Sequence, residues 1–248
     1  MSEFLRTELL ELDRDGCHVW YTNLEQIPDE RLNPCRSWLA PDEIAKLDRF
    51  AAERDRRLYL ATHAMLRAAL SSYADISPAG WSFSTRPDGK PAIAGPRPPP
   101  PLSFNLSHSQ AMGVCAVARG REVGVDVEDT RRPVDVAVLA ERFFTPREAA
   151  DVLARSGPAR CRRFFEYWTL KEAVLKASGE GLVAGLSGFT IEFQPDGAIA
   201  TTSPAGKRLA DRWLLHQTAL NDHCLLAVAL EGPAPLDAPP RLRAWMPR

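Results

Sequence analysis

The sequence predicts a protein that combines α-helices with antiparallel β-strands, a fold of the α+β class. Apolar residues recur with helical spacing in 41–73 and 164–178, whereas apolar and polar residues alternate in 122–128 and 189–193, as they do in strands. The chain has 248 residues, of which 45% are hydrophobic and 25% charged. This size and composition suit one large domain or two small lobes.

Charge and cysteine content exclude several classes of protein. A formal net charge of -1 argues against a general nucleic-acid binder, so any basic patch must be local. The cysteines are odd in number and form no CxxC pair, which favours reduced thiols over disulfides or zinc. The first residues lack an apolar core of secretory length, and no run approaches the ~20 apolar residues of a membrane span. We therefore expect a soluble, cytoplasmic protein that binds neither nucleic acid nor membrane.

The N-terminal part is predicted to contain a strand at 19–23, followed by helix. Pro41, followed by two carboxylates, is typical of a helix start, because the first turn needs no N–H from proline and favours negative charge. Helical periodicity then continues over 41–73 with one break. Within this segment Arg57 is our candidate for an anionic ligand, since arginine is the usual fork for phosphate oxygens, and the neighbouring arginines suit a solvated face.

Short strands and turns are predicted over 81–104. Residues 86–91, RPDGKP, have the composition of a turn in which Gly89 is free to take a positive φ. The turn is either a plain hairpin or a place where Lys90 meets a phosphate. Residues 95–101, GPRPPPP, are expected to form an extended connection at the surface.

A polar triplet, Ser107-His108-Ser109, follows between two strand-like pieces. Its hydroxyls, imidazole and backbone N–H groups can bind an anion. A nucleophile and base pair is not expected, because adjacent residues of an extended chain point to opposite faces. His108 is therefore either a phosphate contact or a structural histidine.

Residues 122–128, EVGVDVE, are predicted to form a strand with one acidic face. The valines share one face, which sends Gly124, Asp126 and Glu128 to the other. The two carboxylates are about 7 Å apart at the backbone, because each residue rises ~3.3–3.4 Å, and they can converge on one ion. Oxygen ligands suit Mg²⁺, with water and phosphates completing its shell, and a half-exposed acidic strand is the alternative.

The helix predicted within 164–182, FFEYWTLKEAVLKASGEGL, carries charge where a buried helix should have none. It is apolar nearly all round, yet Lys171, Glu172 and Lys176 project from or beside one apolar face. An isolated buried ion would cost several kcal/mol. Either Glu172 and Lys176 form an ordinary surface pair at i, i+4, or the charges surround a polyanion and a metal between helix and sheet. Gly179 is expected to end the helix.

Three further segments are expected to be structural. Thr145 and Glu148 form a capping box that opens a helix running to about residue 155. Gly157-Pro158 is expected to close that helix before the next one starts. Alternating residues from 189 to 230 predict antiparallel strands with a turn at 195–197, and the Pro-rich C-terminal residues are expected to be peripheral.

Together, and in this order, these motifs closely resemble the Sfp-type 4′-phosphopantetheinyl transferases. The specific parts are GxDxE at 124–128 and WxxKEAxxKxxGxGL at 168–182, and the GKP turn and the FNLSHS strand agree. The resemblance implies two similar α+β lobes, 1–121 and 122–248, that form an intramolecular pseudo-dimer. It also implies that the final segment packs back on the first lobe, that coenzyme A lies in the cleft between the lobes, and that the protein is a monomer.

The resemblance also implies roles for residues. It assigns Asp126, Glu128 and Glu172 to Mg²⁺, or Mn²⁺, and to the coenzyme A pyrophosphate, and it assigns Lys171 and Lys176 to the phosphates. It places the 3′-phosphate of coenzyme A near Ser107 and His108, and the adenine beside the turn of Gly89, Lys90 and Pro91. Leu58 stands where some members of the family have an arginine, so Arg57 would have to bind the 3′-phosphate instead.

The implied reaction transfers 4′-phosphopantetheine from coenzyme A to a serine of an acyl or peptidyl carrier protein and releases 3′,5′-ADP. A metal and Lys176 would stabilise the charge that grows on the leaving group, and Glu172 or Glu128 would accept the serine proton. Two alternatives are open: a regulatory protein of the same fold that binds coenzyme A without transfer, and a Mg²⁺-dependent diphosphate hydrolase.

Overall fold

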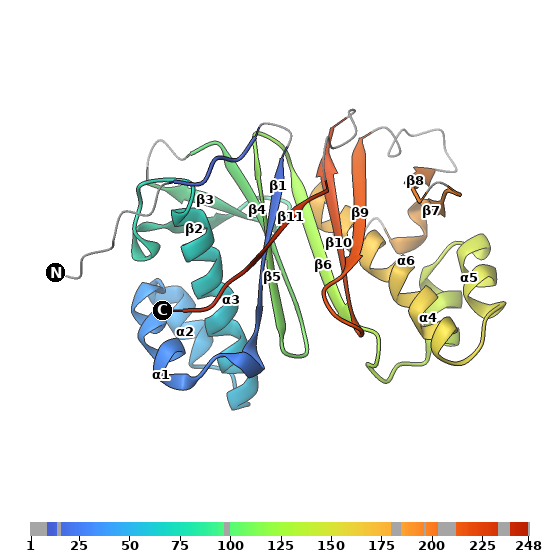
Figure 1. The fold of residues 1–248 in the computed structure, drawn as a ribbon, viewed down its shortest axis with the longest axis horizontal. Helices are drawn as coiled ribbons and strands as arrows, with labels where there is room; N and C mark the ends of the chain where they lie inside the picture. Colours follow the sequence, from blue (N-terminus) through green and yellow to red (C-terminus); the bar gives the residue numbers. More distant parts are fainter. Residues whose placement is uncertain are drawn as a thin grey trace.

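The computed structural model describes residues 9–13, 16–96, 100–179, 185–195, 197–202, 212–232 and 239–247. Two sheets stand beside each other at the centre of the molecule, with helices on the outer side of each (Figure 1). The first sheet has the order β11 (Arg241–Ala244), β1 (Cys17–Asn23), β5 (Met112–Arg119) and β4 (Leu102–Ser109). The second has the order β6 (Val123–Asp129), β10 (Cys224–Glu231) and β9 (Trp213–Ala219). The predicted two-lobed α+β class is confirmed.

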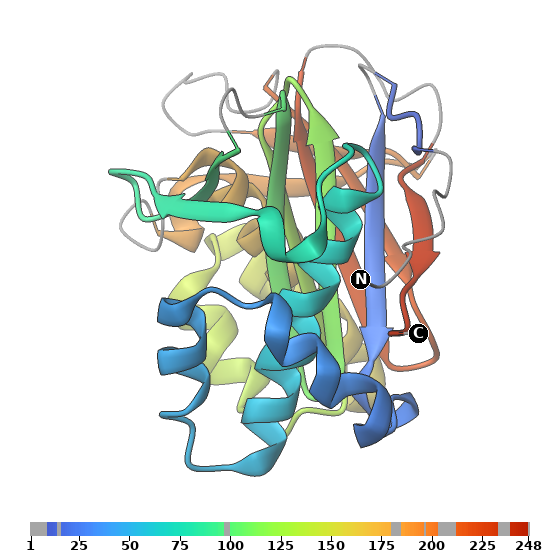
Figure 2. The ribbon, with the colours of Figure 1, turned by 90° about the vertical axis from the view of Figure 1, so that its left-hand side faces the viewer.

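The helices of the first lobe cover the outer face of its sheet. The predicted helical segment with one break is α2 (Pro41–Leu47) followed by α3 (Glu53–Ser71), and a short α1 (Asp29–Leu32) precedes them. Figure 2 shows these helices in front of the strands. The apolar side of α3, including Met65 and Leu70, packs with Phe104 and Val117 of the sheet in one buried cluster. A hairpin of β2 (Ser82–Thr85) and β3 (Pro91–Gly95) completes this lobe.

The second lobe is built around α6 (Gly157–Ser178), which packs on the outer face of the second sheet. The helix begins seven residues before the predicted start at residue 164, so the expectation that Gly157-Pro158 closes the preceding helix is wrong. Proline fits the first helical turn, where no N–H is needed, and here it opens α6. None of the described helices is long and apolar enough to span a bilayer.

Two short helices and a hairpin surround α6. Helix α5 (Pro146–Leu153) starts at the predicted capping box of Thr145 and Glu148, which is confirmed. The other elements are α4 (Val136–Phe143), β7 (Thr190–Phe193) and β8 (Ile199–Thr202). Parts of several expectations fall on residues outside the described ones: Gly181 and Leu182 after α6, 97–99 of the proline-rich connection, Asp196 of the turn, 203–211 among the expected strands, and 233–238 and 248 of the C-terminal segment.

The two lobes meet through their sheets. Val123, Val125 and Val127 of β6 form one buried cluster with Val114 of β5 and Val228 of β10. The backbone N–H of Val125 also donates to Oδ1 of Asn105 on β4 at 2.9 Å. Strand β11, near the end of the chain, pairs in parallel with β1, so this segment lies on the first lobe. The division at 121/122 stays a prediction.

Gly124 permits a close contact between β6 and α6. A Cβ added at this glycine would lie 2.0 Å from the carbonyl oxygen of Ala173 and 2.5 Å from the amide nitrogen of Ala177. Both atoms belong to the helix backbone, which cannot rotate away as a side chain can. Only glycine lets α6 lie this close to the acidic face of β6.

Candidate functional site

A pocket of about 340 Å³ lies where β4, β6 and α6 come together, and we call it the central pocket. All three carboxylates that the sequence singled out, Asp126, Glu128 and Glu172, line it. They come from a strand and from a helix more than forty residues later, and the fold brings all three to the lining of one pocket. The remaining lining residues are Leu106, Ser107, His108, Trp168 and Lys176.

Local structure explains why these side chains meet. Strand alternation turns Asp126 and Glu128 away from the valine face that packs against the first sheet. On α6, Glu172 and Lys176 are four residues apart and therefore lie about 40° apart on the same side of the helix. The glycine contact at position 124 brings that side of the helix against the acidic face of the strand.

Asp126 is the centre of a hydrogen-bonded group. Its Oδ1 accepts from Lys176 Nζ at 2.6 Å and from Ser107 Oγ at 2.8 Å, and Lys176 also contacts Ser107 at 3.0 Å. Its Oδ2 is buried and has no hydrogen-bond partner. A buried carboxylate oxygen without a partner is costly, so Asp126 presents an unsatisfied acceptor at the pocket.

Glu128 is held from two sides. Its Oε2 accepts from Ser109 Oγ at 2.7 Å, and its Oε1 lies 3.2 Å from Arg132. Burial raises the pKa of Glu128, and the charge of Asp126 adds to this effect, against the opposing contributions of Ser109 and Arg132. Sequence reasoning missed Arg132, although its position four residues after Glu128 was the available signal.

Glu172 is half-buried at the opposite side of the pocket. Burial raises the pKa of its carboxyl, and the charges of Asp126 and Glu128 raise it further, while Lys176 opposes them. The three carboxylates thus repel one another, and a hard divalent cation, which takes oxygen ligands, would relieve that repulsion. The unpartnered Oδ2 of Asp126 fits the same need.

Lys171 is not part of the central pocket. Its side chain is fully buried in the second lobe, where Nζ lies 2.9 Å from Glu148 and donates to the carbonyl oxygens of Leu186, at 2.6 Å, and of Phe189. Burial lowers the pKa of Lys171, against the attraction of Glu148. Lys171 lies 100° from Glu172 around the helix, so its ammonium reaches a different environment and the expected phosphate contact is not supported.

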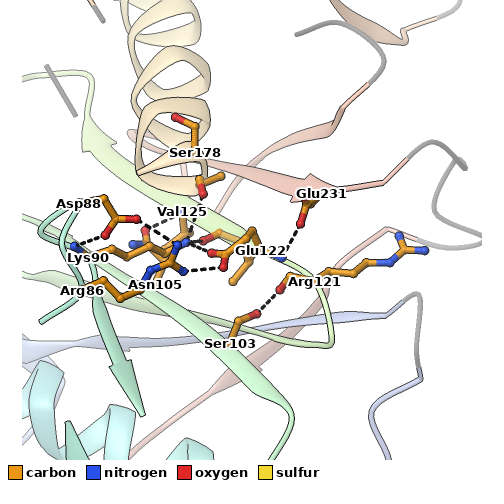
Figure 3. A network of polar contacts seen from close by, with 12 residues as sticks. Arg86, Asp88, Lys90, Ser103, Asn105, Arg121, Glu122, Val125, Ser178 and Glu231 are labelled. Atoms are coloured by element: carbon orange, nitrogen blue, oxygen red, sulfur yellow. Dashed lines mark hydrogen bonds and ion pairs between the residues drawn. The ribbon is translucent and has the colours of Figure 1, made fainter. Parts of the chain in front are cut away.

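Gly89 and Lys90 lie outside the central pocket, between β2 and β3, and Pro91 is the first residue of β3. Gly89 has the expected positive φ of 83°. Figure 3 shows the side chain of Lys90 pointing inward, where Nζ lies 2.6 Å from Glu122 and 2.9 Å from the carbonyl oxygen of Val123. It also lies 3.3 Å from the carbonyl oxygen of Ala177 in α6. The ammonium of Lys90 therefore joins the hairpin to the start of β6 and the end of α6.

Arg57 is also placed away from the pocket lining. Its guanidinium lies 2.8 Å from Asp29 and donates to the carbonyl oxygen of Ile27 at 2.9 Å.

His108, in contrast, is exposed and lines the pocket, as expected of an anion contact rather than a core histidine. Trp168 of α6 lines the pocket too.

Two family models match the chain on either side of the predicted lobe boundary. Residues 122–228 match the 4′-phosphopantetheinyl transferase superfamily, and residues 28–119 match the model 4′-phosphopantetheinyl transferase, N-terminal. The first match contains the three carboxylates of the central pocket.

Curated relatives agree with these matches. The chain is 36% identical to the 4′-phosphopantetheinyl transferase HetI of Nostoc sp. over 90% of this chain and 91% of that protein. It is 30% identical to the 4′-phosphopantetheinyl transferase Sfp of Bacillus subtilis over 73% and 77% of the two chains. A holo-[acyl-carrier-protein] synthase from Thermotoga maritima shares 22% identity and a TM-score of 0.37, over 46% of this chain and 64% of that one. The family matches and the extent of the identity to HetI together show that this chain belongs to the 4′-phosphopantetheinyl transferase superfamily.

Proposed function

We propose that the protein transfers 4′-phosphopantetheine from coenzyme A to a serine of an acyl or peptidyl carrier protein and releases 3′,5′-ADP. The observation that carries this proposal is the meeting of Asp126, Glu128 and Glu172 with Lys176 around one pocket. The names of the relatives, which are 4′-phosphopantetheinyl transferases, support it.

Asp126, Glu128 and Glu172 would hold a divalent cation, Mg²⁺ or Mn²⁺. When bound, such an ion polarises phosphate oxygens and neutralises the charge that develops on the leaving diphosphate. The fit rests on the donor set, which is all oxygen, and on the buried Oδ2 of Asp126 that has no other partner.

Lys176 would bind the phosphates. Its side chain is 28% exposed, so Nζ reaches the pocket while it contacts Asp126. An ammonium held beside a carboxylate is positioned before the substrate arrives, as electrostatic stabilisation requires. Ser107 and His108, on the neighbouring strand, would contact the 3′-phosphate.

Glu172 would accept the proton of the attacking serine. Glu128 is already fixed by Ser109 and Arg132, which suits a ligand more than a base. The raised pKa of Glu172 brings it closer to the working pH, which favours proton transfer once the carboxyl is ionised.

The adenine would lie against the turn of Gly89, Lys90 and Pro91, through the backbone of the turn, because the Lys90 ammonium is engaged elsewhere. Lys171 and Arg57 are left out of the ligand set for the same reason. We further propose the lobe boundary at 121/122, a monomer, and a cytoplasmic protein, which the unpaired state of all five cysteines supports.

The experiment is a mass-spectrometric transfer assay with coenzyme A, Mg²⁺ and apo carrier proteins. We expect the carrier to gain the mass of one phosphopantetheine group, and Asp126→Ala to abolish the gain while the circular dichroism spectrum is retained. Binding of coenzyme A without modification of any carrier would favour the regulatory protein. Breakdown of coenzyme A without a carrier would favour the diphosphate hydrolase.

A further inference from the structure

A second cluster of metal-binding side chains lies outside the central pocket. Asp129, His223 and Cys224 each offer one ligand atom, and these atoms lie within 4.8 Å of one another. Asp129 and Cys224 are only 4% and 3% exposed, and His223 is half-buried. The cluster lies where β6 leads into the connection to α4 and where β10 begins (Figure 1).

The backbone holds these residues in place. Cys224 pairs with Asp129 across the β6–β10 ladder, so their side chains leave the same face of the sheet. The carbonyl oxygen of His223 accepts from the N–H of Thr130 at 2.8 Å. The side chain of Asn221 accepts from the N–H groups of His223 and Cys224, at 3.0 and 2.8 Å, and so fixes the turn that precedes β10. The cluster therefore rests on rigid, hydrogen-bonded backbone.

The cluster is separate from the proposed magnesium site. Strand alternation puts Asp129 on the valine face of β6, whereas Asp126 and Glu128 project from the opposite face. Its donors also differ in kind. A thiolate, an imidazole and a carboxylate suit a borderline-soft ion that prefers tetrahedral geometry, whereas Mg²⁺ prefers oxygen alone.

We propose that Asp129, His223 and Cys224 bind a zinc-type transition-metal ion, with one coordination position left to water. Binding forms bonds from the metal to one oxygen, one nitrogen and the sulfur, and the thiol proton of Cys224 is released to solvent. No cysteine pair in the sequence predicts this site, because the pairing of β6 with β10, and not spacing along the chain, brings Asp129 close to His223 and Cys224.

One present contact must change when the metal binds. Arg131 pairs with Asp129 at 2.7 Å and also donates to it through Nε at 3.0 Å. The arginine side chain is 66% exposed while the Asp129 side chain is 5% exposed, so the arginine can swing into water and leave the carboxylate to the ion. Arg131→Ala is therefore expected to strengthen metal binding.

Titration of the metal-free full chain with Co²⁺ tests the proposal, because cobalt replaces zinc and reports thiolate ligation by a charge-transfer band in the near ultraviolet. We expect one equivalent to produce the band and Zn²⁺ to remove it. Cys224→Ser should abolish the band, and His223→Gln should weaken Co²⁺ binding by at least about tenfold, of the order seen when metal sites lose a supporting group.

Two matched variants separate this site from others. Cys161→Ser removes a half-buried cysteine elsewhere, and Asp126→Asn removes a carboxylate from the central pocket, so both should retain the band. Absence of a band in the unaltered protein, or a band that persists in Cys224→Ser, would overturn the proposal. If Cys224→Ser fails to fold, His223→Gln still tests the site, because the side chain of His223 is half-buried and a substitution there is tolerated. Unchanged Co²⁺ affinity in that variant is an equally negative result.

Discussion

Replacement of Gly124 by alanine tests how the site is assembled. The added Cβ would lie 2.0 Å from a carbonyl oxygen of α6, whereas real Cβ atoms essentially never approach closer than 3.0 Å. The helix must therefore retreat by about 1 Å, because the opposing atoms are backbone. Overpacking a protein interior lowers the free energy of unfolding by about 1–3 kcal/mol. Because the atoms that the new methyl group meets belong to the helix backbone, Gly124→Ala should lie near the upper end of this range, at about 2–3 kcal/mol.

This free energy has a measurable counterpart. In a chain of this size each kcal/mol lowers the melting temperature by about 2–4 °C, so Gly124→Ala is expected to lower it by about 4–12 °C. Because α6 carries Glu172 and β6 carries Asp126, the same movement separates the carboxylates. A displacement of 1 Å costs up to ~10²-fold in rate, and we expect carrier modification to slow by about 10–100-fold.

Gly188→Ala is the matched control, since nothing lies within 4 Å of a Cβ at that position. Thermal unfolding and a Mg²⁺ titration of transfer are measured for both variants and for the unaltered chain. The reasoning is refuted by a Gly124→Ala protein whose melting temperature and Mg²⁺ requirement match those of Gly188→Ala.

Three further predictions concern the charged residues. Lys171→Met leaves the buried carboxylate of Glu148 without its charged partner and should lower the free energy of unfolding by about 3–5 kcal/mol in urea titrations. Arg147→Met, which removes an ion pair of a 76% exposed side chain, should lower it much less, and equal losses would contradict the structural role of Lys171. Burial and mutual repulsion raise the folded-state pKa of Glu128 and Glu172 above 4.5, so the folded protein holds their protons longer than the unfolded chain does. Without divalent ions, the melting temperature should therefore fall as pH rises from about 4.5 through the raised pKa values of the two carboxyls, and saturating Mg²⁺ should abolish this fall. A metal-free melting temperature that does not change over this pH range would argue against the prediction. Glu172→Gln removes the proposed proton acceptor and should slow carrier modification by about 10²–10⁴-fold at saturating Mg²⁺; a rate that survives in Glu172→Gln but is lost in Glu128→Gln would point to Glu128 as the base.

Local patterns predicted the parts that local forces govern. The capping box at Thr145 and the acidic face of β6 follow from spacing along one element, and both appear as expected. The start of α6 was misjudged at Gly157, because a proline at a helix start and one after a helix end look alike in sequence. The ammonium groups of Lys171 and Lys90 show a different limit of sequence patterns. A lysine in a motif indicates that a cation is needed at that position, but it does not indicate which anion the cation contacts. The ammonium groups of Lys171 and Lys90 both contact protein atoms.

The sequence by itself determined the fold class and the family of the chain, because the motifs retain their order. It also determined which carboxylates share a pocket, because the strand and helix periods decide which side chains lie on one face. Tertiary structure alone decided the partners of residues far apart in the sequence: Lys176 with Asp126 and Ser107, and Cys224 opposite Asp129. These contacts depend on the register between strands and on the distance between helix and sheet. Such quantities arise only when distant segments pack, so no pattern along the chain encodes them locally.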